Sequence, residues 1–320
     1  MSAPPSHPVG GRDYPRTLEE FEGWFSTEAA CLDYLVQVRW GRGFRCPACD
    51  SSDAWETARG QRHCRECGRQ TTPTAGTIFQ GTRKPLRTWF RAMWWLTSQK
   101  YGANAKGLQR VLGLKSYETA WAWLHKLRRA MVRPGRDRLG GVVEVDETYV
   151  GGRQAGGAGR RRKGIAVVAI AAQEDGRGIG RIRMARVPNV SGASLVGFVK
   201  TAVVPGATVR TDAWRGYFRL PEHGYKHRST NISKGDDPAH VAMPRVHRVA
   251  ALLGRWWLGT YQGAIRPDHL DYYLDEFTFR FNRRRSRARG MLFYRLLEQA
   301  VQLDAVPLKR LLGGKRNRKM

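Results

Sequence analysis

The chain has 320 residues, 41% of them hydrophobic, which allows two or three globular domains and excludes global disorder. Lysine and arginine number 56 against 27 acidic residues, so the formal net charge is +29. Because a charge this one-sided repels itself in a compact fold, we expect a polyanionic partner, nucleic acid in particular. No apolar run approaches the roughly 20 residues that span a bilayer, and residues 1–25 have no signal-peptide core. We therefore expect a cytoplasmic protein with no membrane partner.

The start of the chain is expected to be a loose segment followed by two short helices. Residues 1–14 are rich in proline and glycine. Thr17-Leu-Glu-Glu20 is similar to a capping box that opens a helix, and a second helix is expected over residues 27–38.

The cysteine pattern then predicts a metal site. Four of the five cysteines form two CxxC pairs, and the fifth, Cys31, lies in an apolar stretch where we expect a buried thiol. In a reducing compartment such pairs favour a metal over disulfides. Two CxxC turns joined by a hairpin bring four thiolates to one tetrahedral ion and leave no open position, which predicts structural zinc rather than a redox dithiol. The ligands are expected to be Cys46, Cys49, Cys64 and Cys67.

We therefore predict a zinc ribbon with flanking helices over residues 15–80. A ribbon of this kind is also a common protein–protein module. By itself it does not indicate nucleic acid.

Residues 81–133 are expected to be helical and to contain a helix-turn-helix. Segments 104–112 and 117–132 meet at Gly113, and Ser116 is placed to cap the second helix. Apolar residues recur at helical spacing along that second helix and predict its buried face: Ala120, Trp121, Leu124, Leu127 and Met131. Lys126 and Arg129 point elsewhere, which favours a recognition helix that contacts DNA. The alternative is an ordinary helical hairpin with a solvated charged face.

After a linker at residues 133–137, β-type runs alternate with helical ones, which predicts an α/β domain over residues 140–302. Two of its short strands end in an acid followed by a turn, Val142-Val-Glu-Val-Asp146 and Ala207-Thr-Val-Arg-Thr-Asp212. Three strands, a helix and a fourth strand fit the ribonuclease H-like fold, in which the ends of the first and fourth strands lie side by side. The predicted fold is thus a ribonuclease H-like catalytic domain preceded by a zinc ribbon and a helix-turn-helix.

Asp146 and Asp212 are the candidate ligands of catalytic metal ions. Two carboxylates at adjacent strand ends can hold two Mg²⁺ or Mn²⁺ ions about 4 Å apart, an arrangement that suits cleavage of a phosphodiester. The alternative is that each aspartate only caps the turn that follows it.

Taken together, the motifs resemble those of a known family. They are the two CxxC pairs, Thr74-Ala-Gly-Thr77, the helix-turn-helix, Val145-Asp-Glu-Thr-Tyr-Val-Gly-Gly152, Thr211-Asp-Ala-Trp-Arg-Gly-Tyr217, Leu258-Gly-Thr-Tyr-Gln-Gly263 and Leu274-Asp-Glu-Phe-Thr-Phe-Arg-Phe-Asn-Arg-Arg284. Over residues 17–302 the sequence resembles bacterial insertion-sequence transposases with an amino-terminal zinc ribbon and an ISXO-two-like integrase domain.

The resemblance implies a DDE-type mechanism with Asp146 and Asp212 as the first two acids. Its third position, which varies among Glu, Asn and His in relatives, falls on His247; the alternatives for this residue are a DNA-phosphate contact or packing in a helix. Relatives usually carry a lysine seven residues later, where this chain has Gly254 followed by Arg255. Either Arg255 substitutes or this copy is weakened. Three other acids on a helix expected over residues 268–281 rank below His247: Asp271, Asp275 and Glu276.

The implied function is that of a transposase that binds the terminal inverted repeats of its element, cleaves them and transfers them into target DNA. By analogy it would act on double-stranded DNA as a homo-oligomer in a synaptic complex. Residues 303–320 form a basic tail, and the basic residues expected to hold DNA, besides Lys126 and Arg129, are Arg160, Arg161, Arg162, Arg255, Arg283, Arg284 and Arg285. The competing interpretations are a non-enzymatic DNA-binding regulator, a decayed transposase that binds ends without cutting, and a nuclease without strand transfer.

Overall fold

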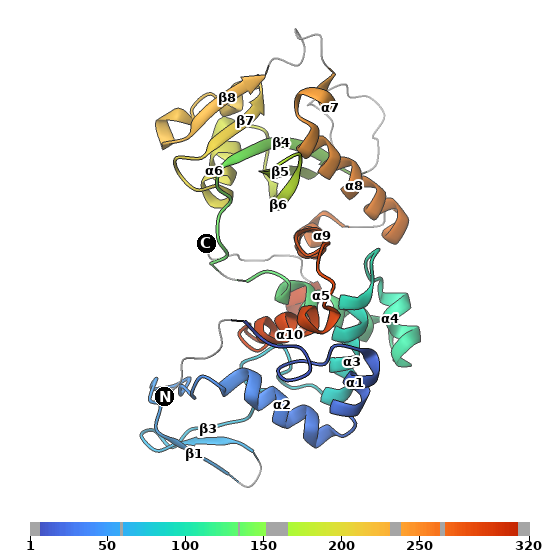
Figure 1. Cartoon of the computed structure of the whole chain (residues 1–320). Coiled ribbons are helices and arrows are strands. Elements are labelled where there is room, and N and C mark those ends of the chain that lie inside the picture. Colours follow the sequence, from blue (N-terminus) through green and yellow to red (C-terminus); the bar gives the residue numbers. More distant parts are fainter. Residues whose placement is uncertain are drawn as a thin grey trace. The chain divides into compact units, whose positions relative to one another are not determined.

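The computed structural model describes residues 7–57, 60–133, 135–151, 166–230, 238–262 and 266–312. The chain divides into two units, residues 1–133 with 286–320, and residues 134–285 (Figure 1). Within the described residues there is no helix with the length and apolar character of a membrane span.

The first unit combines helices with a small antiparallel sheet of order β1-β2-β3. Its strands are β1 (Ala54–Glu56), β2 (Arg62–Cys64) and β3 (Gln70–Thr71), and its helices are α1 (Leu18–Trp24), α2 (Glu28–Trp40), α3 (Leu86–Ser98), α4 (Ala105–Leu112), α5 (Tyr117–Ala130), α10 (Arg289–Ala300) and α11 (Leu308–Leu312).

The helix starts of this unit follow ordinary capping chemistry. The side chains of Thr17, Thr27 and Ser116 accept backbone N–H groups in the first turns of α1, α2 and α5. Helix α3 opens after Pro85 without a side-chain cap of its own. In its place, the carboxylate of Glu28 accepts the N–H groups of Leu86 and Arg87, at 2.6 and 3.1 Å.

An aromatic core joins α10 to the helices near the amino terminus. Phe293 of α10 is fully buried, and its ring centroid lies 5.4 to 6.5 Å from those of five other rings. The five rings belong to Phe21, Phe25, Tyr34, Phe90 and Trp94. Aromatic side chains contribute large buried areas, so α10 is part of this core. The second unit accordingly ends at Arg285, whereas the sequence analysis extends the α/β domain to residue 302.

The second unit is built on a five-stranded sheet of order β6-β5-β4-β7-β8. Its strands are β4 (Val142–Val150), β5 (Ala166–Asp175), β6 (Gly178–Val187), β7 (Thr208–Asp212) and β8 (Lys226–Thr230). The β4–β5 and β5–β6 pairs are antiparallel, and the β4–β7 and β7–β8 pairs are parallel. Its helices are α6 (Gly192–Ala202), α7 (Ala239–Ala242), α8 (Pro244–Tyr261) and α9 (Leu270–Asn282), with short 3-10 turns η2 (Arg215–Tyr217), η3 (Pro221–His223) and η4 (Pro267–His269).

Helices cover both faces of this sheet, and the alternation of side chains decides which residues meet which helix. Val143 and Val145 of β4 share a core with residues of α6, such as Leu195. The opposite face, represented by Ile170 of β5, packs against α8 and α9 through residues that include Val246. In Figure 1, α8 runs beside β4 and β5. Because successive side chains point to opposite faces, Glu144 and Asp146 are directed to the α8 side.

Gly290 allows α10 to approach the segment before α1. A Cβ atom built at this position would lie 1.6 Å from the carbonyl oxygen of Pro15, a distance that no packing adjustment short of backbone movement can relieve. We predict that Gly290→Ala destabilises the first unit by about 1–3 kcal/mol or more, as overpacking of a close contact does. Urea unfolding of the full chain, followed by tryptophan fluorescence, measures this.

Gly23→Ala is the matched control, because Gly23 lies in α1 of the same unit and a Cβ there meets nothing within 4 Å. It should leave stability unchanged or raise it by up to about 1 kcal/mol. Equal stabilities for the Gly290 variant and the wild type would contradict this account of the α10 contact.

Candidate active site and metal centres

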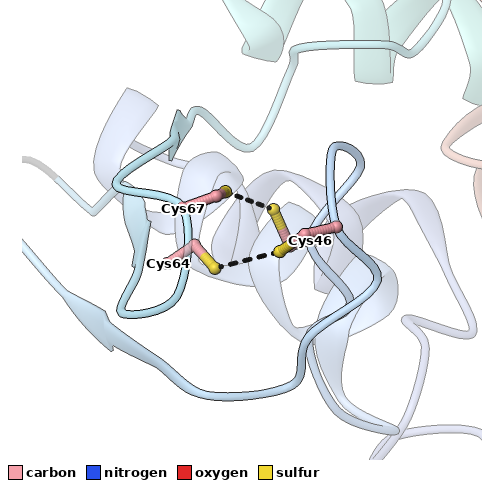
Figure 2. Close-up of side chains that lie close together, drawn as sticks. Cys46, Cys64 and Cys67 are labelled. Atoms are coloured by element: carbon pink, nitrogen blue, oxygen red, sulfur yellow. Dashed lines mark hydrogen bonds between the residues drawn. The ribbon is translucent and has the colours of Figure 1, made fainter.

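The four ribbon cysteines lie together beside the small sheet of the first unit (Figure 2). The sulfur of Cys46 is 3.5 Å from that of Cys67, and the sulfur of Cys49 is 3.5 Å from that of Cys64. All four sulfurs lie within 4.8 Å of one another. Tetrahedral Zn–S bonds of about 2.3 Å place sulfurs about 3.8 Å apart, so the donor type and the spacing both fit zinc.

Both CxxC turns are built in the same way. The N–H of Cys46 donates to the carbonyl of Ser51 at 2.9 Å, and the N–H of Cys64 donates to that of Arg69 at 3.0 Å. Each turn ends in a residue of positive φ, Asp50 at 59° and Gly68 at 70°. A backbone N–H donated by Ala48 is the largest cause that lowers the pKa of the Cys46 thiol, to about 6. Amide donors of this kind favour the thiolate, which is the form that binds metal.

In the second unit, Asp146 and Asp212 come from neighbouring parallel strands. Strand β4 pairs with β7 so that Val143 lies opposite Val209 and Glu144 opposite Arg210. Asp146 and Asp212 each lie two residues beyond the last of these pairs, so their side chains point to the same face of the sheet. The carboxylate of Asp212 also accepts the N–H of Trp214 at 3.1 Å, so Asp212 caps the turn that follows β7.

His247 extends from the first turns of α8 toward Asp146. Its Nε2 lies 3.9 Å from Oδ2 of Asp146 and is buried without a hydrogen-bond partner among the described residues. Burial lowers the pKa of His247, which keeps the imidazole neutral and able to ligate a metal at pH 7. At 3.9 Å these two atoms face each other, but they are farther apart than the roughly 3 Å that separates neighbouring ligands of an octahedral ion with bonds of about 2.0–2.1 Å.

Asp146, Asp212 and His247 are nevertheless more widely spaced as a set than the cysteines. Within the described part of the chain, the cysteines are the one group of three or more His, Cys, Asp or Glu residues whose ligand atoms all lie within 4.8 Å. The side chains of Asp146 and His247 are 19% and 30% exposed.

Charged neighbours that the sequence analysis did not identify surround these three residues. Arg210 and Arg245 both contact the carboxylate of Glu144 on the α8 side of the sheet. On the other side, the hydroxyl of buried Tyr217 donates to Glu147 at 2.9 Å, which ties the end of β4 to the turn after β7. Burial, and next the charge of Glu147, raise the pKa of Tyr217 well above its usual value. In the sequence, Glu144, Glu147, Arg210 and Tyr217 lie within five residues of one of the two aspartates, and Arg245 lies two residues before His247.

The other acids considered for the third position lie on α9 or at its start. Glu276 is fully buried, and its carboxylate accepts from Arg280 at 2.8 Å and from the hydroxyl of Tyr261 at 3.2 Å. Asp275 is also buried, and Asp271 lines a surface hollow with Pro267 and Arg186. Glu276 is thus engaged in packing α9, which does not favour it as a metal ligand.

Gly254 and Arg255 lie on the exposed part of α8. A Cβ at Gly254 meets nothing within 4 Å, so the structure has room there for a longer side chain.

Two of the expected DNA contacts lie on α5. The ammonium of Lys126 is 5.9 Å from the Trp89 ring centroid, and burial lowers its pKa. Arg129 donates to the carbonyl of Asp304 at 3.4 Å. Helix α5 buries residues around most of its circumference, among them Trp123, so its C-terminal half presents little surface to DNA.

The three arginines after α9 contact the second unit itself. Arg283 and Arg284 lie over the rings of Phe279 and Phe281, each 4.1 Å from the centroid, and Arg284 also donates to the carbonyl of Ile179. Arg285 pairs with Asp175 at 3.0 Å while both stay exposed. Arg160, Arg161 and Arg162, and residues 313–320 of the basic tail, fall outside the described residues.

Two family models match this chain, one in each unit. The model of the ISXO2-like transposase domain matches residues 138–282, and that of the transposase zinc-ribbon domain matches residues 26–70. The chain belongs to the IS1595 family of transposases. The family expected from the sequence is therefore confirmed, as is a mixed α/β fold that carries a transposase domain.

The relatives of this transposase include a protein of another transposable element. It is described as an uncharacterised protein in the transposable element ISH50 of Halobacterium salinarum, and it is 28% identical over 283 residues, 80% of this chain and 91% of that protein. A chain in the cryoEM structure of the simian T-cell lymphotropic virus intasome in complex with PP2A regulatory subunit B56 gamma matches at 12% identity and a TM-score of 0.28. That match covers 54% of this chain and 63% of the viral one, and a score this low does not establish a shared fold.

The cysteine cluster yields a direct test of metal content. We predict that Cys64→Ser, which replaces a fully buried ligand, lowers bound zinc from about one equivalent to near zero and opens the β1–β2–β3 sheet. Mass spectrometry of the metal and hydrogen exchange of residues 44–71 measure the two effects. Cys31→Ala is the control, since Cys31 is buried outside the cluster and its loss should leave zinc content unchanged. Full zinc retention in Cys64→Ser would rule out a four-cysteine site.

Proposed function

We propose that this transposase binds the ends of its element and catalyses metal-dependent DNA cleavage and strand transfer. The observation that carries the proposal is that Asp146 and Asp212 lie on adjacent parallel strands, each two residues beyond the paired Glu144 and Arg210, inside the domain that matches the transposase family. His247 faces Asp146 from α8 and completes the set.

The strand arrangement supports a ribonuclease H-like fold for the second unit. In chain order its strands are first to fifth, and in the sheet they stand third, second, first, fourth, fifth. Only the second strand runs against the others, because β4 and β6 are both antiparallel to β5 while β4, β7 and β8 are mutually parallel. This order brings the ends of the first and fourth strands together, where the fold expected from the sequence requires its acids.

Asp146, Asp212 and His247 would hold the catalytic ions, with Mg²⁺ or Mn²⁺ as the metals that suit two carboxylates. Such ions supply Lewis-acid activation of the attacking oxygen and stabilisation of the leaving oxygen. The chain's own contribution is to fix two carboxylates and a neutral imidazole at an exposed sheet edge. In a protein of net charge +29, the two aspartates would place negative charge where the metal ions bind, and the overall positive charge of the chain favours the DNA backbone.

Zinc in the ribbon would be structural. Four thiolates complete a tetrahedral shell and leave no position for a substrate, so the ion would hold the hairpin that follows α2.

Helices α4 and α5 would form the helix-turn-helix, with the DNA contacts shifted from those expected. Gly113 ends α4 with φ of 60°, as the turn of this motif requires. The exposed residues lie on α4 and at the start of α5, and they include Lys106, Arg110, Lys115 and Tyr117. Recognition helices read base edges with their N-terminal residues, so this end of α5 would enter the major groove.

Joining two ends also calls for at least two copies of the chain, which supports a homo-oligomer on DNA.

We predict that Asp146→Asn and Asp212→Asn each lower end cleavage by at least about 10³-fold while binding to end DNA stays within about twofold. The loss follows because two-metal chemistry needs both carboxylates. Cleavage and joining of labelled element ends, with Mn²⁺ and a target plasmid, measure it. His247→Ala tests the third ligand in the same assay, and it should lose at least about tenfold.

Asp271→Asn is the matched control, an acid of the same unit on α9, and it should cut as the wild type does. Tight end binding by a wild type that never cuts would identify a DNA-binding protein without catalytic function. Cutting without joining would identify a nuclease.

A second prediction concerns the DNA-binding face. Lys115→Gln should weaken end binding and reduce the slope of log affinity against log salt by about 1, as the loss of one phosphate contact does. Lys126→Gln should leave that slope unchanged, because the Lys126 ammonium is half-buried over Trp89. Fluorescence anisotropy over a salt series measures both. A larger change of the salt slope for Lys126→Gln than for Lys115→Gln would contradict this prediction and place the DNA contacts on the C-terminal half of α5.

A further inference from the structure

A second set of charged residues lies beside the three candidate ligands. Glu144, Arg210 and Arg245 stand on β4, β7 and α8, each two residues before Asp146, Asp212 and His247 in turn. We propose that this ionic anchor (Glu144, Arg210 and Arg245) positions the three ligands relative to one another. The inference rests on the proposed function, because it assigns these residues to the same metal site.

Glu144 takes the place of an N-cap side chain for α8. Met243 occupies the N-cap position and makes no side-chain cap hydrogen bond, and Pro244 opens the helix. Oε2 of Glu144 accepts the N–H groups of Arg245 at 2.7 Å and Val246 at 3.1 Å. These donors have no partner within the helix, and the positive end of the helix dipole favours a carboxylate. The turn that carries His247 is thereby held against β4.

The two arginines connect the same carboxylate to the rest of the site. Nη1 of Arg245 donates to Oε1 of Glu144 at 2.9 Å, and Nη2 of Arg245 pairs with Glu174 at 3.0 Å. Nη1 of Arg210 lies 3.8 Å from Oε1 of Glu144. Arg210 also donates to the carbonyl of Ala242, at the end of α7, at 3.0 Å. Strand β7 is therefore linked both to β4 and to the entry of α8.

Stability alone is a weak reason for this arrangement. Glu144 is fully buried, and the side chain of Arg245 is 11% exposed. Taking such charges out of water costs free energy that apolar residues of similar volume would not, so a buried ion pair is poor evidence of stabilisation. What the charged side chains supply is a fixed orientation of β4, β7 and α8 relative to one another. Because side chains two residues apart share a face of a strand, the anchor and the ligands move together on β4 and on β7.

The test compares Glu144→Gln with Glu174→Gln in the zinc-loaded full chain. Electron paramagnetic resonance of free Mn²⁺ gives the metal affinity, and end cleavage over a Mn²⁺ series gives the metal requirement. We expect Glu144→Gln to weaken Mn²⁺ binding and end cleavage by about 10–100-fold each, the usual effect of losing a residue that orients metal ligands. End-DNA affinity should stay within about twofold. Glu174→Gln also removes a partner of Arg245 but leaves the α8 cap in place, and it should bind Mn²⁺ as the wild type does.

Unchanged Mn²⁺ affinity in Glu144→Gln overturns the proposal, and so does an equal loss in Glu174→Gln. If Glu144→Gln does not fold, Arg210→Gln replaces it, since that side chain is 30% exposed and should shift the metal requirement in the same direction. A wild type that binds Mn²⁺ through Asp146 but never cuts DNA would overturn the proposed function, and the Mn²⁺ affinities of the variants would still test the ionic anchor. If the wild type shows no Mn²⁺ binding that a substitution of Asp146 removes, both the proposed function and the ionic anchor are overturned.

Discussion

The parallel pairing of β4 with β7 constrains every candidate ligand of the second unit. Val143 lies opposite Val209, and both valines are buried in the core under α6. Side chains alternate along a strand, so burying these valines directs Glu144 and Asp146 to the α8 face. A slip of one residue would turn Glu144 and Asp146 into the apolar core under α6 and the two valines to the α8 face, which the core does not allow. The packing that stabilises the sheet thus also directs Asp146 and Asp212 to one face of it.

Features encoded over short stretches of chain could be predicted from the sequence. The two CxxC pairs are local turns, and their spacing already indicates a common ion before the sulfurs are seen 3.5 Å apart. The strands that carry the two acids fall in the same category, because their alternation is visible within ten residues. Only Asp212 ends its strand as expected, however, since β4 pairs with β5 past Asp146 as far as Val150. The helix starts at Thr17 and Ser116 are equally local, as each depends on one side chain and its first turn.

Features that depend on distant contacts could not be predicted. Glu144 meets Arg245 about a hundred residues later, and nothing in either local pattern marks the pair. Phe293 joins a core whose other rings lie in the first hundred residues, which moves α10 out of the α/β unit. Lys126 follows helical spacing as a surface residue, yet α5 is buried on several sides and its ammonium lies over Trp89. In each case tertiary packing, rather than periodicity, determines the role of the side chain.

Acids at one sheet edge, in a chain otherwise dominated by lysine and arginine, are the central element of this account. Localised hydroxyl-radical cleavage tests it most directly: Fe²⁺ replaces Mg²⁺ in the zinc-loaded protein, peroxide is added, and the cut sites in the backbone are mapped. The account predicts cuts within residues 144–148, 210–214 and 245–249, all lost in Asp146→Ala. Cuts that persist in Asp146→Ala, or that leave out one of the three segments, would contradict a metal site shared by Asp146, Asp212 and His247.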